Sequence, residues 1–147
     1  MIKCIVVGKM NHKYLNEGIE YYKKQLPVQL EIIEIKDEKD ASGMEQEGMH
    51  ILNKIKDNDV VVALAIKGKL LDSHQFSKLI EDVNTYQQGD LVFVIGGSYG
   101  LSEAVYQRAN HQISFSKMTF PHQMMRLILI EQIYRGFMIM KNHPYHK

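Results

Sequence analysis

Val60-Val61-Val62-Ala63-Leu64-Ala65-Ile66 is an apolar run without a single polar interruption. A strand that faces water on one side alternates apolar and polar residues, whereas a strand covered on both faces reads as a continuous apolar run. Such a run predicts a strand in a parallel sheet that helices cover on both faces. The expected fold class is therefore α/β.

Four other apolar runs, rich in Val and Ile, are bounded by turn residues. With Val60–Ile66 they give five predicted strands, the others being Ile2–Val7, Leu30–Ile35, Leu91–Ile95 and Gln112–Phe115. The stretches between the strands show helical spacing of apolar residues, and some begin at plausible caps such as Ser73 and Ser102. The predicted helices span residues 14–25, 44–55, 73–87, 102–109 and 122–141. Strand and helix alternate, as in a mostly parallel sheet flanked by helices.

Length and composition fit one globular domain over residues 1–147, since single domains commonly span roughly 100 to 200 residues. Hydrophobic residues make up 45% of the chain and charged residues 24%, unlike a disordered or fibrous protein. Cys4 is the only cysteine, so no internal disulfide is expected. The first apolar run is too short for a signal peptide, and we expect a cytoplasmic protein.

The last predicted helix, residues 122–141, has apolar side chains around most of its circumference. Arg126, Glu131 and Arg135 interrupt it, which argues against a membrane span and predicts a helix buried on more than one side. We expect one side to pack on the sheet and the other on a second subunit, in a homodimer with twofold symmetry. Glu131 can pair with Arg135 four residues on, but Arg126 has no local mate, which makes it a candidate for a substrate phosphate or cofactor carboxylate.

The net charge of +1 bears on the class of partner. Nonspecific binding to nucleic acid depends on many Lys and Arg contacts to phosphates, which this balance of charges does not favour. Any RNA partner must therefore be recognised locally.

A glycine-rich turn, Gly96-Gly97-Ser98-Tyr99-Gly100, follows the fourth predicted strand. Glycine lets a ligand approach the backbone, so the turn is a candidate pocket floor, although a plain strand-to-helix turn is equally compatible with it. The turn matches neither the P-loop nor the GxGxxG fingerprint, and a Rossmann site places its glycines after the first strand. A nucleotide-binding oxidoreductase is therefore disfavoured.

The loop after the fifth strand, residues 115–120, contains two phenylalanines and a methionine before Pro121. A strand end that enters a loop is the simpler interpretation, with Pro121 at a helix start. Such a loop would be more polar, however, and the apolar content favours the wall of a pocket for a purine ring.

The chain ends in Asn142-His143-Pro144-Tyr145-His146-Lys147. Histidine and tyrosine suit proton transfer or base recognition. A frayed terminus is the ordinary alternative, and a zinc half-site with His122 is a second one that lacks cysteine or acidic ligands. We expect no metal.

Together these motifs resemble the ribosomal RNA large subunit methyltransferase H family, a minimal branch of the SPOUT methyltransferases. Five ordered motifs spread over the whole chain carry the resemblance. They are Val7-Gly8-Lys9, Ile66-Lys67-Gly68-Lys69, the stretch from Phe93 to Gly100, the stretch from Ser114 to Arg126, and the closing Asn-His-Pro-Tyr-His. The resemblance implies a SPOUT-type α/β domain with a C-terminal trefoil knot, a feature that is rare in proteins.

The resemblance also implies a reaction: methyl transfer from S-adenosylmethionine to N3 of a pseudouridine in 23S ribosomal RNA of the assembled 70S ribosome. It assigns the cofactor site to Leu64, Gly96 and Phe115-Ser116-Lys117-Met118-Thr119-Phe120. It implies a homodimer in which the C-terminal tail of one subunit completes the site of the other. Many relatives carry a Pro-Glu pair where this chain has Ser98-Tyr99, so no carboxylate is expected to act there.

The reaction needs N3 aligned with the methyl carbon and help in removing a weakly acidic imide proton. Tyr145 and His146 are the candidates for orienting the base or accepting that proton. Arg126 and Lys117 are candidates for phosphate contacts, and His122 and His143 are further ones. A noncatalytic RNA-binding or ribosome-associated module remains the competing hypothesis, and it predicts no affinity for the cofactor.

Overall fold

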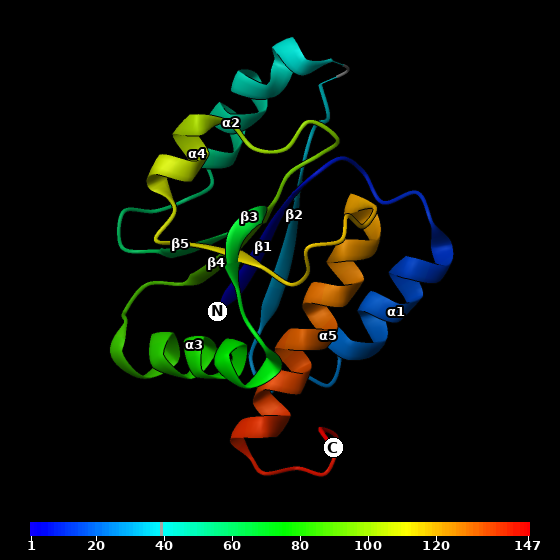
Figure 1. The fold of residues 1–147 in the computed structure, drawn as a ribbon, viewed down its shortest axis with the longest axis vertical. Coiled ribbons are helices and arrows are strands. Elements are labelled where there is room, and N and C mark those ends of the chain that lie inside the picture. Colours follow the sequence, from blue (N-terminus) through cyan, green and yellow to red (C-terminus); the bar gives the residue numbers. More distant parts are fainter. Residues whose placement is uncertain (39) are drawn as a thin grey trace.

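The computed structural model describes residues 1–38 and 40–147, and within them the chain forms one five-stranded sheet (Figure 1). The strands lie in the order β2-β1-β4-β3-β5, and every neighbouring pair is parallel. Their bounds are β1 (Ile2–Val7), β2 (Leu30–Ile35), β3 (Val60–Leu70), β4 (Leu91–Ile95) and β5 (His111–Ser114). The predicted α/β class with a parallel sheet is confirmed, while the knot stays a prediction.

Helices cover both faces of the sheet. Their bounds are α1 (Lys13–Lys23), α2 (Met44–Leu52), α3 (Ser73–Tyr86), α4 (Glu103–Arg108) and α5 (His122–Met140), with a short 3-10 turn η1 (Ala41–Gly43) before α2. One core cluster joins β1, β3 and β4 to α1, α3 and α5, and a second joins the opposite face to α2 and α4. The continuous apolar strands are therefore buried from two sides, as their sequences predict.

The third strand is longer than the apolar run predicts, and it is interrupted. Leu64 and Lys69 both pair with Ile113 of β5, so residues 65–68 lie outside the ladder. We call residues 65–68 the β3 bulge. A Cβ at Gly68 would lie 2.7 Å from the backbone nitrogen of Ile113, so only glycine fits where the chain returns to the ladder.

Helix α5 packs between α1 and α3 of the same chain (Figure 1). The approach is close on both sides, because Gly18 of α1 faces Leu127 and Gly136 of α5 faces Ser77, whose hydroxyl donates to the Gly136 carbonyl at 2.7 Å. These contacts within the chain bury many of the apolar side chains around α5, while Met124 and Ile128 on the same helix stay half-buried. Among the helices described, none has the length and apolar character needed to cross a membrane.

Cys4 lies in β1 with its thiol buried, and burial raises the pKa of that thiol to about 12. Since the thiolate is the reactive form, we expect a disulfide reagent at pH 8 to label the native protein at least about a thousandfold more slowly than the urea-unfolded protein. Stopped-flow labelling in both states measures the ratio. Native labelling at the rate of a free thiol would show that β1 is accessible.

Candidate functional site

A cavity of about 590 Å³ lies at the carboxyl ends of β3, β4 and β5. Ligands of open parallel sheets bind at this edge, and the volume is in the range of small-molecule sites. Most of its lining comes from three segments: the start of the β3 bulge, the glycine turn after β4, and the connection from β5 into α5. The lining residues are Leu64, Ala65, Ile66, Lys67, Ile95, Gly96, Gly97, Ser98, Gly100, Leu101, Tyr106, Gln112, Ile113, Ser114, Phe115, Ser116, Met118, Thr119, Phe120, Pro121, His122 and Met125.

The glycine turn forms one wall through its backbone. The Gly100 N–H donates to the Gly97 carbonyl at 3.1 Å, and Gly100 has a φ of +83°, a conformation that favours glycine. A Cβ at Gly96 would lie 2.8 Å from the carbonyl carbon and oxygen of Gly100. The turn therefore needs glycine at position 96 to keep this shape.

Serine hydroxyls hold the start of the β5–α5 connection. Ser114 Oγ donates to the Ser116 carbonyl at 2.8 Å, and the Met118 N–H donates to Ser116 Oγ at 2.9 Å. Phe115 packs edge-on against Phe76 of α3, with ring centroids 5.2 Å apart. This loop is thus an ordered wall with backbone groups beside an apolar surface.

Seven of the eight residues that the resemblance assigns to the cofactor line this cavity. The exception is Lys117, which is not among the lining residues and whose side chain is exposed. Sequence reasoning missed the β3 bulge as a wall of the site. An isolated glycine in a strand pattern indicates a bulge, and Gly68 was the available signal.

His122 begins α5 and lines the cavity. Burial and the neighbouring Arg126 charge lower the pKa of His122, against a smaller opposing effect of Asp37. The folded protein therefore excludes a proton that the unfolded chain takes up near pH 6.5. Stability from this group is present above pH 6.5 and falls as the pH drops below it.

We expect an NMR titration to place His122 below pH 6.5. We also expect His122→Gln to lose less stability than the parent chain between pH 7.5 and 5.5 in urea unfolding, since the variant lacks the excluded proton. A titration midpoint at or above the ordinary histidine value would contradict this.

Arg126 has protein partners far away in the sequence. Its Nη2 donates to the carbonyls of Val7 and Gly8 at 2.9 and 2.7 Å, and its Nη1 lies 3.2 Å from Glu34 Oε2. The side chain is 3% exposed. A phosphate contact by Arg126 stays a prediction, and the guanidinium holds the ends of β1 and β2 together.

The C-terminal tail packs against α5. Tyr145 lies edge-on against Tyr134, with centroids 4.8 Å apart, and the Arg135 guanidinium lies 4.7 Å from the centroid of the Tyr145 ring. Arg135 Nε donates to Glu131 Oε1 at 2.7 Å, which confirms the predicted pair. His146 Nδ1 is 3.0 Å from Arg135 Nη1. The tail is therefore docked on this face of the helix.

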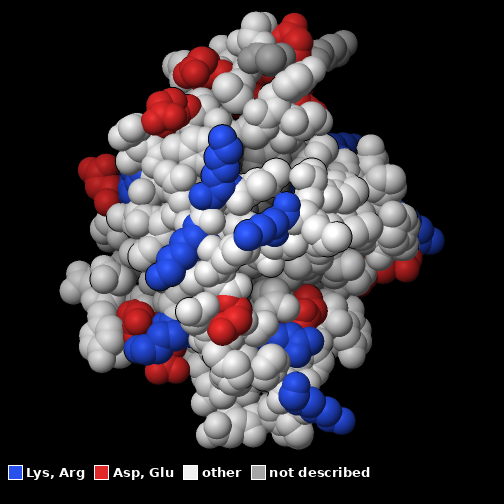
Figure 2. Space-filling view, viewed as in Figure 1, with Lys and Arg blue, Asp and Glu red and all other residues white. Residues whose placement is uncertain are grey.

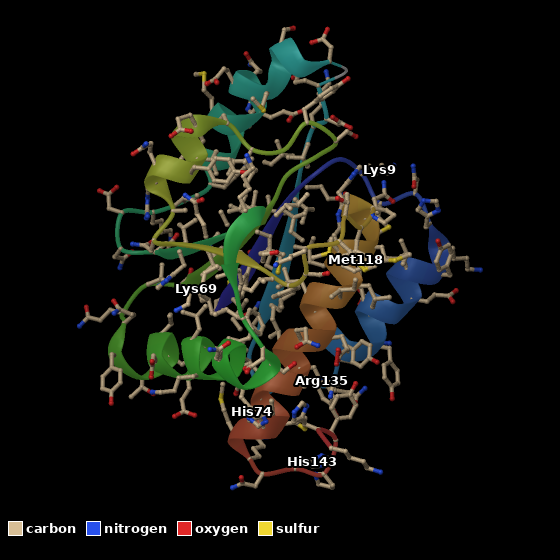
Figure 3. The ribbon with its side chains drawn as sticks, in the orientation of Figure 1. Lys9, Lys69, His74, Met118, Arg135 and His143 are labelled. Atoms are coloured by element: carbon tan, nitrogen blue, oxygen red, sulfur yellow. The ribbon has the colours of Figure 1, made fainter. Side chains whose placement is uncertain are left out.

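The C-terminal tail and the cavity lie at different ends of α5. Figure 3 shows Met118, at the cavity, near one end of the helix, and Arg135 and His143 toward the other. Helix α5 has 19 residues, so it is roughly 28 Å long. The structure thus gathers seven of the eight predicted cofactor residues at the cavity, while Tyr145 and His146 lie away from it in the same chain. Within the described residues, no three His, Cys, Asp or Glu side chains group as a metal site.

Comparisons with known proteins agree over the whole chain. Residues 1–146 match the family described as "Predicted SPOUT methyltransferase". A protein of Enterococcus faecalis is 54% identical over 99% of both chains, and one of Acholeplasma laidlawii is 51% identical over 99% of both. Both are named Ribosomal RNA large subunit methyltransferase H.

A solved structure of a probable methylase family protein from Haemophilus influenzae Rd KW20 also matches. It has a TM-score of 0.61 and 12% identity, covering 99% of this chain and 70% of that one. At this identity the likeness concerns the fold alone.

Proposed function

The chain belongs to the SPOUT methyltransferase family, in the branch named for ribosomal RNA large subunit methyltransferase H, and we propose that it methylates N3 of a pseudouridine in 23S ribosomal RNA. The relatives' names support an rRNA substrate, and the choice of base and atom follows from the family resemblance. The observation that carries the proposal is the cavity at the carboxyl edge of the sheet, walled by the glycine turn and the β5–α5 connection. We place the protein in the cytoplasm, with the assembled 70S ribosome as its substrate.

Family members use S-adenosylmethionine in general, and the cavity fits a cofactor of that kind. Because Gly96 has no Cβ, which would collide with Gly100, its backbone groups line the cavity directly. Phe115 and Leu64 supply apolar surface for a purine ring. We propose that these residues and the loop 116–120 hold the cofactor. S-adenosylmethionine supplies a methyl carbon that its sulfonium already activates. The chain has to position the base, exclude water and take the imide proton.

We propose that a second subunit completes the site. In one protomer Tyr145 and His146 contact α5 at Tyr134 and Arg135, whereas the cavity adjoins the start of the helix at His122. A twofold dimer with α5 helices packed antiparallel would bring each tail to the other subunit's cavity. The half-buried apolar residues left on α5 support such an interface.

The two tail residues differ in what they can do. Burial, together with Tyr22 and Glu131, raises the pKa of Tyr145 well above its ordinary value. Its phenol therefore stays protonated and can donate a hydrogen bond to the base, but it is a poor proton acceptor. We assign orientation of the base to Tyr145 and acceptance of the N3 proton to His146.

The test is transfer of labelled methyl from S-adenosylmethionine to 70S ribosomes that lack the modification, beside separate subunits and naked 23S RNA. We expect methylated pseudouridine from assembled ribosomes alone. No transfer to any substrate, from a protein with no affinity for S-adenosylmethionine, would favour the noncatalytic module.

Subunit mixing tests the shared site. His146→Gln removes the proposed proton acceptor, and Gly96→Val blocks the cavity wall, so each homodimer should be inactive. In mixed dimers one of the two sites has both parts intact, and at equal mixing we expect roughly a quarter of the wild-type rate for independent sites. Recovery of no activity, although mixed dimers form, would place the tail in the site of its own subunit.

A further inference from the structure

We propose that Lys67, Lys69 and Lys117 bind phosphates of the RNA strand that carries the target base, and so form a local RNA-binding rim around the cavity. This inference rests on the proposed function, because it names the surface by which that substrate is held. We call the three residues the lysine rim.

The cavity is built from segments that contain no acidic residue. Residues 60–71, 91–102 and 104–130 lack both Asp and Glu, although the chain has 17 acidic residues elsewhere. All lining residues of the cavity fall in these segments. The lining residues themselves therefore carry no carboxylate, even though the chain as a whole is almost neutral. Asp37, from outside these segments, is the carboxylate beside Gly97 and His122.

The lysines come from two segments that adjoin the cavity, and Lys67 is the one of the three that lines it. Lys67 lies in the β3 bulge, Lys69 follows where β3 rejoins β5, and Lys117 lies in the β5–α5 connection. All three side chains are exposed, and none forms an ion pair with a described residue. Figure 2 shows basic side chains across the middle of this face, and Figure 3 places Lys69 and Met118 on it.

Apolar side chains accompany the lysines. Ile66 is 58% exposed and Met118 is 72% exposed, and both line the cavity. Single-stranded nucleic acid is commonly bound by surfaces that combine positive charge along the backbone with aromatic side chains on which bases stack. Ile66 and Met118 offer bases an apolar contact surface without an aromatic ring. Protein–protein interfaces, by contrast, are depleted of lysine, so three exposed lysines are not typical of the centre of such an interface. The observations thus favour RNA over a second copy of the chain on this rim.

The β3 bulge explains how the strand presents its charge. A regular strand would keep residues 65–68 in the ladder with β5, whereas the bulge takes them out of it, and residues 65–67 line the cavity. Gly68 permits the close return to Ile113. The positively charged edge is therefore held by backbone geometry.

The experiment compares two triple variants with the same change of charge. The test variant is Lys67→Gln, Lys69→Gln and Lys117→Gln. The control is Lys24→Gln, Lys54→Gln and Lys56→Gln, which alters exposed lysines that precede β2 and β3 and so lie toward the amino edge of the sheet. Binding to unmodified 70S ribosomes and to a 23S RNA stem-loop is measured at several salt concentrations without cofactor. Sedimentation gives the oligomeric state of each variant.

A Lys contact to a phosphate contributes about one unit to the slope of log affinity against log salt. We expect the test variant to lower that slope by about two to three units for at least one of the two probes, and the control to leave it near the wild-type value. In turnover with saturating cofactor, we expect a rise in KM for the ribosome to accompany the loss of slope.

Two results would overturn the inference. An unchanged slope in the test variant would show that the lysines make no phosphate contacts. If the test variant loses self-association to the same extent as it loses RNA binding, the lysine rim belongs to the subunit interface.

If the wild type binds RNA through the lysine rim and yet transfers no methyl group, the proposed function fails while the inference on the rim stands. If wild-type transfer is normal and the rim variant matches it in KM and slope, only the inference fails.

Discussion

Replacing Gly96 by alanine should weaken binding of S-adenosylmethionine by more than tenfold, which is more than about 1.4 kcal/mol. A Cβ there would lie 2.8 Å from backbone atoms of Gly100. Those atoms cannot move aside freely, because the Gly100 N–H donates a hydrogen bond to the Gly97 carbonyl and so closes the turn. The wall of the cavity must shift, and cofactor contacts to it are lost. Isothermal titration calorimetry with the purified variant measures the change.

Gly97→Ala is the matched control. Gly97 lines the same cavity, but a Cβ on it would meet the Val7 side chain at 3.2 Å, a contact that a small displacement can relieve. We expect a smaller loss of affinity than for Gly96→Ala, with both variants folded by circular dichroism. Equal affinities in the two variants would show that the close approach of Gly96 to Gly100 does not shape the cofactor site.

Arg126→Met should destabilise the protein by about 2 kcal/mol, since the guanidinium is buried and its loss leaves two carbonyl groups without a donor, whereas Glu34 is 40% exposed and can be hydrated. The methionine preserves much of the volume but leaves the carbonyls of Val7 and Gly8 without this donor. Glu34 keeps the Met10 N–H, at 2.7 Å, as its remaining partner. Urea unfolding at fixed protein concentration gives the difference.

Arg135→Met, on the same helix, is the comparison. Arg135 is 24% exposed and pairs with Glu131 one turn away, and partly exposed pairs of this kind contribute about 1 kcal/mol or less. Both variants remove one positive charge from α5, so a general effect of charge cancels. Coincident unfolding curves would contradict the role given to Arg126.

Most of the fold could be predicted from local pattern. The runs 2–7, 30–35 and 91–95 coincide with β1, β2 and β4. The central strand β4 is continuous in apolar residues and buried throughout, whereas the edge strand β2 carries exposed Glu31 and Glu34. The extension of β3 to Leu70 could not be predicted, because Lys67 and Lys69 interrupt the apolar run and only pairing with β5 defines their state. The order of strands in the sheet likewise depends on long-range pairing that no local pattern records.

Parts of the candidate site could likewise be predicted from local sequence, and other parts could not. Its glycine turn and its apolar loop have signals within a few residues, and both line the cavity. The partners of Arg126 have no such local signal, because they lie 92 to 119 residues away, on β2, at the end of β1 and directly after it. Local spacing therefore leaves Arg126 without a mate, whereas the fold supplies a carboxylate and two carbonyls, and a contact of Arg126 with substrate stays a prediction. The tail's place on α5 is also a tertiary property.

Helix α5, the last element to be synthesised, completes the cover on one face of the sheet. Leu129, Ile130 and Ile133 belong to the same core cluster as Ile2 of β1 and Phe93 of β4, so this face stays partly uncovered until the last helix has been made. A parallel sheet offers no hairpin that could form early, and its contacts span most of the chain. The nascent polypeptide should therefore remain unfolded until translation is almost complete, and a chain that stops before α5 should expose this face to aggregation.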